Sequence, residues 1–198
     1  MLTESEEKLS FYDEELNEIG IASRSEIHAN GLLHKVVHCW IVDESSNEKW
    51  IYLQQRSYKK KDFPGLYDIS AAGHVDIGEE IENALKREVK EEIGIEINSR
   101  NLRFVGSIRE KLNLNSFLNN EICEVYLYNI KDPKFNIGSE VEKIVKLSVS
   151  EFKKLVLGRY DYIMAFSIDE KLKFNIRAHE FCVHKKEYLK SIIDFIGK

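Results

Sequence analysis

The sequence of 198 residues contains only three cysteines and two prolines. Cys39, Cys123 and Cys182 are odd in number, far apart and outside any CxxC spacing, which argues against a disulfide framework and a cysteine-based zinc site. We therefore expect them to be small buried residues. With prolines only at Pro64 and Pro133, and with no repeat or low-complexity segment, the chain shows no flexible linker. This favours a single domain over residues 1–198.

The chain also lacks a long apolar run and a positive net charge. No apolar stretch approaches the roughly 20 residues that a helix needs to span a bilayer. The start, MLTESEEKLS, has neither the basic nor the apolar region of a secretion signal. We therefore expect a cytoplasmic protein without a membrane partner. The net charge of −5 provides no general attraction to nucleic acid polymers, so a phosphate-bearing partner needs a local basic patch or a bridging cation.

The composition, 43% hydrophobic and 32% charged, is typical of a globular protein. β-branched and aromatic residues indicate strands at 34–43 and 49–56 (joined by the polar turn ESSNE), 66–73, 102–112, 122–130 and 141–149. Apolar periodicity indicates helices at 78–93, 149–158 and 184–197. This order predicts an α/β (α+β) fold with a mixed sheet packed by helices on both faces. Residues from about 150 to 198 are interpreted as a C-terminal helical extension.

The helix at 78–93 has the clearest pattern and carries clustered acidic residues. Its apolar residues recur at helical spacing, and Gly94 follows where a left-handed cap is expected. Glu88, Glu91 and Glu92 stand at i, i+3 and i+4, which places them on one arc of about 100°. Like charges so close destabilise a helix unless a cation compensates them, and Mg²⁺ or Mn²⁺ prefers oxygen ligands. The alternative is a solvated helix face, which is what most charge runs are.

The spacing around these glutamates decides between the two interpretations. It matches every fixed position of the pattern G-x5-E-x7-R-E-U-x-E-E-x-G-U, where U is a bulky apolar residue. The matching residues are Gly73, Glu79, Arg87, Glu88, Val89, Glu91, Glu92, Gly94 and Ile95. Residues 73–95 therefore resemble the Nudix box, and the chain is similar to Nudix hydrolases.

The resemblance implies an α/β/α sandwich with a mixed sheet and a catalytic loop-helix. It implies hydrolysis of a diphosphate linkage in a nucleoside diphosphate derivative or related pyrophosphate, by attack of a metal-activated water on phosphorus. One glutamate takes the proton, and which one does so differs within the family. The cofactor implied is Mg²⁺ or Mn²⁺, and the partner is a small-molecule diphosphate. The oligomeric state is left open, with a homodimer as one alternative. The implied ligands are Glu88, Glu91, Glu92 and the Gly73 carbonyl, with Arg87 and Glu79 bracing the loop-helix.

The segments flanking the box resemble a narrower branch, which includes the isopentenyl-diphosphate isomerases. The stretch QQRSYKKKDFPGLYDISAAGH carries the R…KK…PG pattern of that branch. By this resemblance Arg56, Lys60 and Lys61 hold the diphosphate of the substrate, although a solvated lysine run is the alternative. The segments NEICEVY and GLLHKVVHCWIV resemble metal-binding segments of the isomerases. The implied ligands are Glu121, His74 and His34, with His28 offset by about one residue from a further histidine.

Two departures from the isomerases concern the chemistry itself. Moving a double bond needs a proton donor and an acceptor on opposite faces, and the isomerases place a cysteine just before the Gly-His pair, where this chain has Ala71 and Ala72. The isomerases also usually break the R-E-x-x-E-E part of the box, which is whole here. We therefore expect a hydrolase. The alternatives are an isopentenyl-diphosphate delta-isomerase that uses another acid, and a non-catalytic nucleotide-sensing module.

Overall fold

The computed structural model describes residues 7–114 and 117–196. Its centre is a nine-stranded sheet with the order β11-β10-β9-β4-β3-β8-β7, in which β5 also pairs with β4 and β6 with β3. The strands are β3 (His34–Asp43), β4 (Trp50–Arg56), β5 (Tyr67–Asp68), β6 (Ala71–His74), β7 (Leu102–Leu114), β8 (Phe117–Asn129), β9 (Val141–Ser148), β10 (Tyr162–Ser167) and β11 (Lys173–Arg177).

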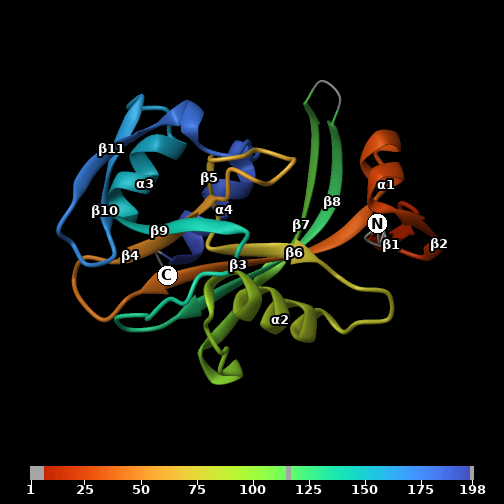
Figure 1. The fold of residues 1–198 in the computed structure, drawn as a ribbon, viewed down its shortest axis with the longest axis horizontal. Coiled ribbons are helices and arrows are strands. Elements are labelled where there is room, and N and C mark those ends of the chain that lie inside the picture. The colour runs from red at the N-terminus through yellow and green to blue at the C-terminus, as the bar shows by residue number, and fades with distance from the viewer. Residues whose placement is uncertain (1–6, 115–116, 197–198) are drawn as a thin grey trace.

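The sheet is mixed, as the sequence predicts. β3 and β8 run parallel, with His34 opposite Glu121 and Val42 opposite Asn129, and the other pairings are antiparallel. The predicted hairpin of β3 and β4 is confirmed, with Asp43 opposite Trp50. β7 and β8 form a long hairpin that extends beyond the sheet towards α1 (Arg24–Asn30) (Figure 1).

Helices cover both faces of the sheet. α2 (Ile81–Ile93) lies on one side, and α3 (Val149–Val156) and α4 (Lys186–Ile196) lie on the other (Figure 1). Side chains of β3 alternate between the two cores: Val37, Cys39 and Ile41 pack with α2, and Val36, Trp40 and Val42 pack with α3 and α4. This alternation follows from the two-residue period of a strand. The predicted α/β/α sandwich is therefore confirmed.

The glutamate helix is shorter at its start than the pattern predicts. α2 begins at Ile81 because Gly78 has a φ of 75°, outside the helical region, and Glu80 is the extended N-cap residue. Its end agrees with the prediction, since Gly94 forms a left-handed cap with a φ of 72° and donates its N–H to the Lys90 carbonyl.

Three local features differ from the predictions. The stretch 66–73 is two short strands rather than one, because β5 pairs with β4 and β6 pairs with β3. The N-terminal unit of β1 (Lys8–Tyr12), β2 (Glu18–Ser23) and α1 was not predicted. The proposed helical extension is only partly helical, because it also contains the hairpin β10–β11, which continues the sheet beside β9. Two short 3₁₀ turns complete the chain, at Ser99–Asn101 and Ala178–Glu180.

Among the described helices, none combines the length and apolar character needed to cross a membrane.

Candidate active site

The predicted site residues converge on a cavity of about 500 Å³. It opens beside α2 and is lined by the loop-helix, by β4 and the loop after it, by β8 and by segments near both ends of the chain. The predicted residues that line it are Gly73, His74, Arg87, Glu88, Glu91, Glu92, Arg56, Lys60, Glu121 and His28.

Glu92 lies at the buried end of the glutamate arc, with only 3% of its surface exposed. Its Oε2 accepts hydrogen bonds from the backbone N–H of Ala72 and from Nε2 of Gln54, both at 2.9 Å. Burial raises the pKa of Glu92 to about 8, although the hydrogen bond from Ala72 opposes this shift. Glu92 is thus fixed in place by two donors while its charge remains poorly compensated, which a cation would correct.

Glu88 lies against the backbone of Gly73. A Cβ atom at position 73 would overlap the carboxyl carbon and both oxygens of Glu88, so the carboxylate occupies the space that the missing side chain leaves. The Glu88 Oε1 is 2.6 Å from Nη1 of Arg87. Burial raises the pKa of Glu88 to about 7, against the effect of Arg87. Glycine is therefore required at position 73 for the approach of Glu88.

Arg87 joins the loop to the helix as the resemblance implies. Its Nε and Nη2 donate to the two carboxylate oxygens of Glu79 at 3.1 and 2.8 Å, and Nη2 also donates to the His74 carbonyl at 3.0 Å. Glu79 in turn accepts from the backbone N–H of Asp76 at 3.1 Å. Bidentate pairs of this kind fix geometry as well as adding energy. Glu91 is exposed and lies 3.7 Å from Nη1 of Arg87.

The donor set fits a hard divalent cation. Glu88, Glu91 and Glu92 line one cavity and offer carboxylate oxygens, the ligands that Mg²⁺ and Mn²⁺ prefer. The raised pKa values of Glu88 and Glu92 indicate that the protein itself undercompensates their negative charge. Glu92 is buried, however, so the arc is not uniformly solvated as a surface charge run would be.

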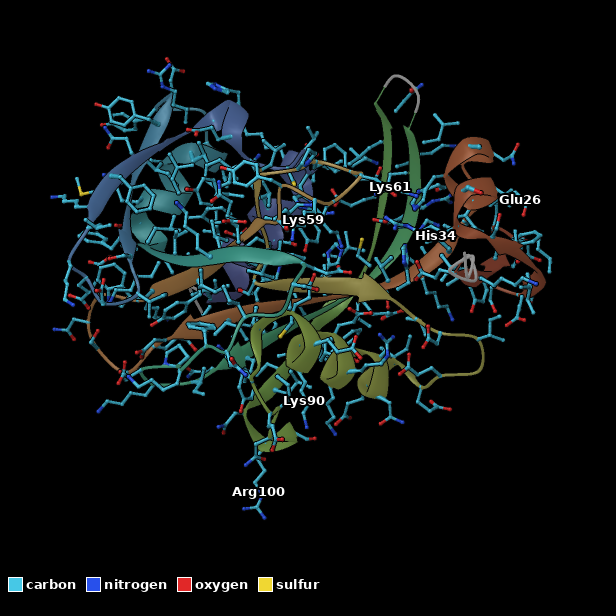
Figure 2. All side chains as sticks on the ribbon, in the orientation of Figure 1. Glu26, His34, Lys59, Lys61, Lys90 and Arg100 are labelled. Carbon is cyan, nitrogen blue, oxygen red and sulfur yellow. The ribbon has the colours of Figure 1, made fainter. Side chains whose placement is uncertain are left out.

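Two of the three predicted diphosphate-binding residues reach the cavity. Arg56 lines it and donates from Nε and Nη2 to the Asp62 carbonyl, at 3.2 and 3.1 Å, while Nη1 lies 3.4 Å from Oδ2 of Asp68. Lys60 lines it and pairs with Glu140. Lys61 is exposed on the loop between β4 and β5 (Figure 2), and it is not among the described residues that line the cavity.

Three histidines from different elements meet beside the cavity, and two of them, His28 and His74, line it. His28 of α1, His34 at the start of β3 (Figure 2) and His74 of β6 have ligand nitrogens within 4.8 Å of one another. His34 is fully buried, with Nδ1 3.0 Å from the Leu32 carbonyl. Its Nε2 lies 3.6 Å from Oε1 of Glu121 and has no hydrogen-bond partner among the described residues. His28 therefore reaches the other two histidines from α1, although its position in the sequence differs by about one residue from that of the isomerases' histidine.

The donor atoms of this group suit metal binding. Burial lowers the pKa of His28 to about 4, with the neighbouring histidines acting in the same direction. Burial alone would raise the pKa of Glu121, but its interactions with His34, His38 and His74 hold that pKa at about 2. Imidazole nitrogens and a carboxylate oxygen are the donor set of a transition metal such as zinc, manganese or iron. An orphaned, buried Nε2 on His34 fits such an ion.

Several residues in the cavity wall, or in contact with it, were not anticipated from the sequence. Gln54 donates a hydrogen bond to Glu92, Oε1 of Glu7 accepts from Nδ1 of His74 at 2.9 Å, and Arg24 pairs with Asp62 at 2.8 Å. His184 and its neighbours Cys182 and Val183 line the cavity from the segment before α4, where the sequence indicated no site residue. No local pattern marks these residues, because they reach the cavity through contacts between distant parts of the chain.

A mixed sheet between helices, with a glycine-bounded loop leading into a glutamate-bearing helix over a cavity, defines the Nudix class of α/β/α proteins. The family model described as "NUDIX domain" matches residues 32–166. The chain therefore belongs to the Nudix domain family.

Individual relatives agree with this membership. An uncharacterized Nudix hydrolase of Clostridium acetobutylicum is 31% identical over 198 residues, covering 95% of this chain and 96% of that protein. Isopentenyl-diphosphate Delta-isomerase 1 of Photorhabdus laumondii is 28% identical over 158 residues, or 79% of this chain and 88% of that protein. The resemblance to the isomerase-like branch is thereby confirmed.

The fold is also similar to a solved structure. A crystal structure of a Deinococcus radiodurans protein has a TM-score of 0.61 and 20% identity, covering 77% of this chain and 90% of that chain. At this identity the similarity concerns the fold.

Proposed function

We propose that the chain is a divalent-metal-dependent hydrolase that cleaves a diphosphate linkage in a nucleoside diphosphate derivative or a related pyrophosphate. The observation that carries the proposal is the convergence of Glu88, Glu91 and Glu92 on one cavity that Arg56 and Lys60 also line. Carboxylates for a cation and guanidinium or ammonium groups for a phosphate are the two requirements for binding such a substrate.

In this proposal the cavity residues have three roles: metal binding, support of the loop, and phosphate binding. Glu88, Glu91 and Glu92, with the Gly73 carbonyl, hold Mg²⁺ or Mn²⁺, which when bound neutralises phosphate charge and makes water more acidic. Arg87 and Glu79 hold the loop against the helix, so that Gly73 and Glu88 keep their close approach. Arg56 and Lys60 bind the phosphate oxygens. One of the glutamates accepts the proton of the attacking water.

A complete set of glutamates argues against a purely sensing role. A module that binds a nucleotide without turnover has no need of Glu88, Glu91 and Glu92 together in one cavity. Magnesium-dependent phosphate or pyrophosphate release from any diphosphate substrate would exclude that role.

The second candidate function is isopentenyl-diphosphate isomerisation, which the histidine group and Glu121 favour. At the position of the isomerases' cysteine, however, Ala72 lines the cavity and donates its backbone N–H to Glu92. A methyl group cannot donate or accept a proton, so the chemistry of the cavity favours hydrolysis.

We also propose that His28, His34, His74 and Glu121 hold a transition-metal ion. The test is the metal content of the purified protein, measured by mass spectrometry, with His179→Gln as the control because His179 is exposed. His34→Ala is expected to lose the bound metal, and His179→Gln to keep it. Equal metal content in the two variants would contradict the assignment.

The central test is a screen with Mg²⁺ of nucleoside diphosphate derivatives, dinucleoside polyphosphates and prenyl diphosphates, assayed for phosphate or pyrophosphate release. Glu92→Gln keeps the size and hydrogen-bonding shape of the side chain and removes one ligand charge, so hydrolysis should fall by about 100-fold or more while the fold is retained. The control is Glu96→Gln, which changes a side chain that is 80% exposed on the same segment. Turnover by Glu92→Gln equal to that of the control would remove Glu92 from the ligand set.

A further inference from the structure

A row of four alternating charges leads from the proposed diphosphate site to the C-terminal segment. Nη1 of Arg56 lies 3.4 Å from Oδ2 of Asp68, whose Oδ1 lies 3.0 Å from Nε2 of His184. Nδ1 of His184 lies 2.6 Å from Oε2 of Glu110. The row thus connects β4, β5, the segment before α4, and β7.

His184 is held between two carboxylates and against one aromatic ring. Glu110 is 1% exposed, and its second oxygen accepts the backbone N–H of Lys185 at 2.6 Å, so one carboxylate fixes both the side chain and the adjoining backbone. The ring of Tyr188 stacks on His184 with centroids 5.2 Å apart. Burial alone would lower the pKa of His184, but the hydrogen bonds to Asp68 and Glu110 raise it to about 10. Both ring nitrogens therefore carry protons and donate.

The residues just before His184 form part of the wall of the cavity. The backbone N–H of Cys182 donates to the Tyr67 carbonyl at 2.8 Å, and Phe181 forms a parallel bridge with Tyr67, so the segment runs beside β5. Cys182, Val183 and His184 line the same cavity as the glutamates of α2. This segment lies beyond residue 166, where the match to the family model ends.

We propose that His184 is a positioning residue for the diphosphate of the substrate, acting on Arg56 through their shared partner Asp68. This inference rests on the proposed function of the cavity. With both ring nitrogens occupied by carboxylates, His184 has no lone pair with which to accept a proton, so its role is electrostatic and structural. It divides the negative charge of Asp68 between two cations, which leaves Arg56 able to pair with a phosphate.

Removal of the imidazolium would change this balance in a definite direction. Asp68 would then direct its whole charge to Arg56, and it would also face Glu110 without a cation between them. Charge pairs at this distance in a partly buried site interact strongly. Arg56 would be held more tightly by the protein and would bind an anionic ligand less well.

The test uses methylenediphosphonate, a diphosphate analogue that is not hydrolysed, with Mg²⁺ and isothermal titration calorimetry. Four proteins are compared with the wild type: His184→Gln, Arg56→Ala, the double variant, and His179→Gln as the exposed control. Arg56→Ala should weaken binding about 10- to 100-fold, and His184→Gln about 5- to 10-fold. The double variant should bind within about twofold of Arg56→Ala, because His184 acts through Arg56. His179→Gln should bind like the wild type.

The outcomes separate the inference from the function on which it rests. If the wild type does not bind the analogue, or if Arg56→Ala binds it as the wild type does, the diphosphate site fails and the inference fails with it. If Arg56→Ala weakens binding but His184→Gln does not, or if the two effects multiply in the double variant, the inference alone is overturned.

A measurement on the wild-type protein covers the case in which His184→Gln does not fold. The ¹⁵N resonances of the His184 ring should show two protonated nitrogens at pH 7, and they should shift when the analogue binds. A neutral ring at pH 7, or resonances that the analogue leaves unchanged, would overturn the positioning role.

Discussion

Gly73 lies so close to Glu88 that its replacement by alanine tests the geometry of the metal site. The added methyl would lie under 3.0 Å from the carboxyl carbon and both oxygens of Glu88, whereas carbon atoms in favourable contact are about 3.5–4.0 Å apart. The carboxylate cannot swing aside freely, because Arg87 holds it at 2.6 Å. The carboxyl carbon would be 2.0 Å from the methyl, so it must move by about 1.5 Å to reach normal contact, and a misplacement of only about 1 Å can already cost about two orders of magnitude in rate.

Gly73→Ala is expected to reduce kcat/KM about 100-fold for any substrate that the wild type hydrolyses. Mn²⁺ affinity, measured by electron paramagnetic resonance in the absence of substrate, should fall as well. Overpacking should cost about 1–3 kcal/mol of unfolding free energy, which urea denaturation would measure.

The matched control is Gly78→Ala, in the loop between β6 and α2. A Cβ there has open space around it, but the φ of 75° is unfavourable for alanine, at about 1–2 kcal/mol. It should therefore lose stability while hydrolysis and Mn²⁺ affinity stay close to wild type. If Gly73→Ala hydrolyses and binds Mn²⁺ as well as the control does, the Glu88 carboxylate does not act from the position described.

Three further predictions concern Arg56, Ala72 and His184. Arg56→Ala should raise KM about 10- to 100-fold with little change in kcat, because a guanidinium on a non-reacting phosphate binds ground and transition states alike; a pure loss of kcat would contradict this. Incubation with isopentenyl diphosphate and Mg²⁺ should give no dimethylallyl diphosphate, and Ala72→Cys alone should not create the activity, since the facing acid must also be placed to within about 1 Å. Product that depends on Glu121 would reverse the choice between hydrolase and isomerase. The pKa of His184 is raised in the folded state to about 10, so its charge stabilises the fold fully below about pH 6.5, and that stabilisation disappears as the pH rises through about 10. The difference in unfolding free energy between the wild type and His184→Gln should therefore become smaller between these two pH values. A difference that does not change with pH would contradict the protonated ring.

The parts of the fold that were predictable are those with a strong local pattern. α2 was predictable because its apolar stripe and the cap at Gly94 lie within one short segment. The separation of β5 from β6 was not, because it depends on which neighbouring strand each one pairs with, and both partners lie elsewhere in the chain. The hairpin β10–β11 was missed for the same reason, since its place in the sheet is set by β9.

The site divides in the same way. The spacing of Glu88, Glu91 and Glu92 placed them together because a helix converts sequence spacing directly into spatial proximity. Burial of Glu92 was not visible in that spacing, because it results from Gln54 and Ala72 on other elements. Three adjacent lysines gave no indication that Lys60 lines the cavity while Lys61 is exposed, since a loop has no fixed period. The contact of His184 with Asp68 joins residues 116 apart, which no local pattern encodes.

The parallel pairing of β3 with β8 has a consequence for the order in which the protein is made. β3 contributes to both cores, yet its parallel partner begins more than 80 positions later, since His34 pairs with Glu121. On a ribosome, β3 and β4 can form their hairpin early, but one edge of β3 has no β8 to pair with until that strand has left the exit tunnel. Such an edge is a target for unwanted association. The cavity forms later still, because its lining includes both Arg24, near the start of the chain, and His184, which is synthesised near the end. A nascent chain arrested before β8 should therefore depend on chaperones, and substrate binding should begin only after the segment around His184 has been synthesised.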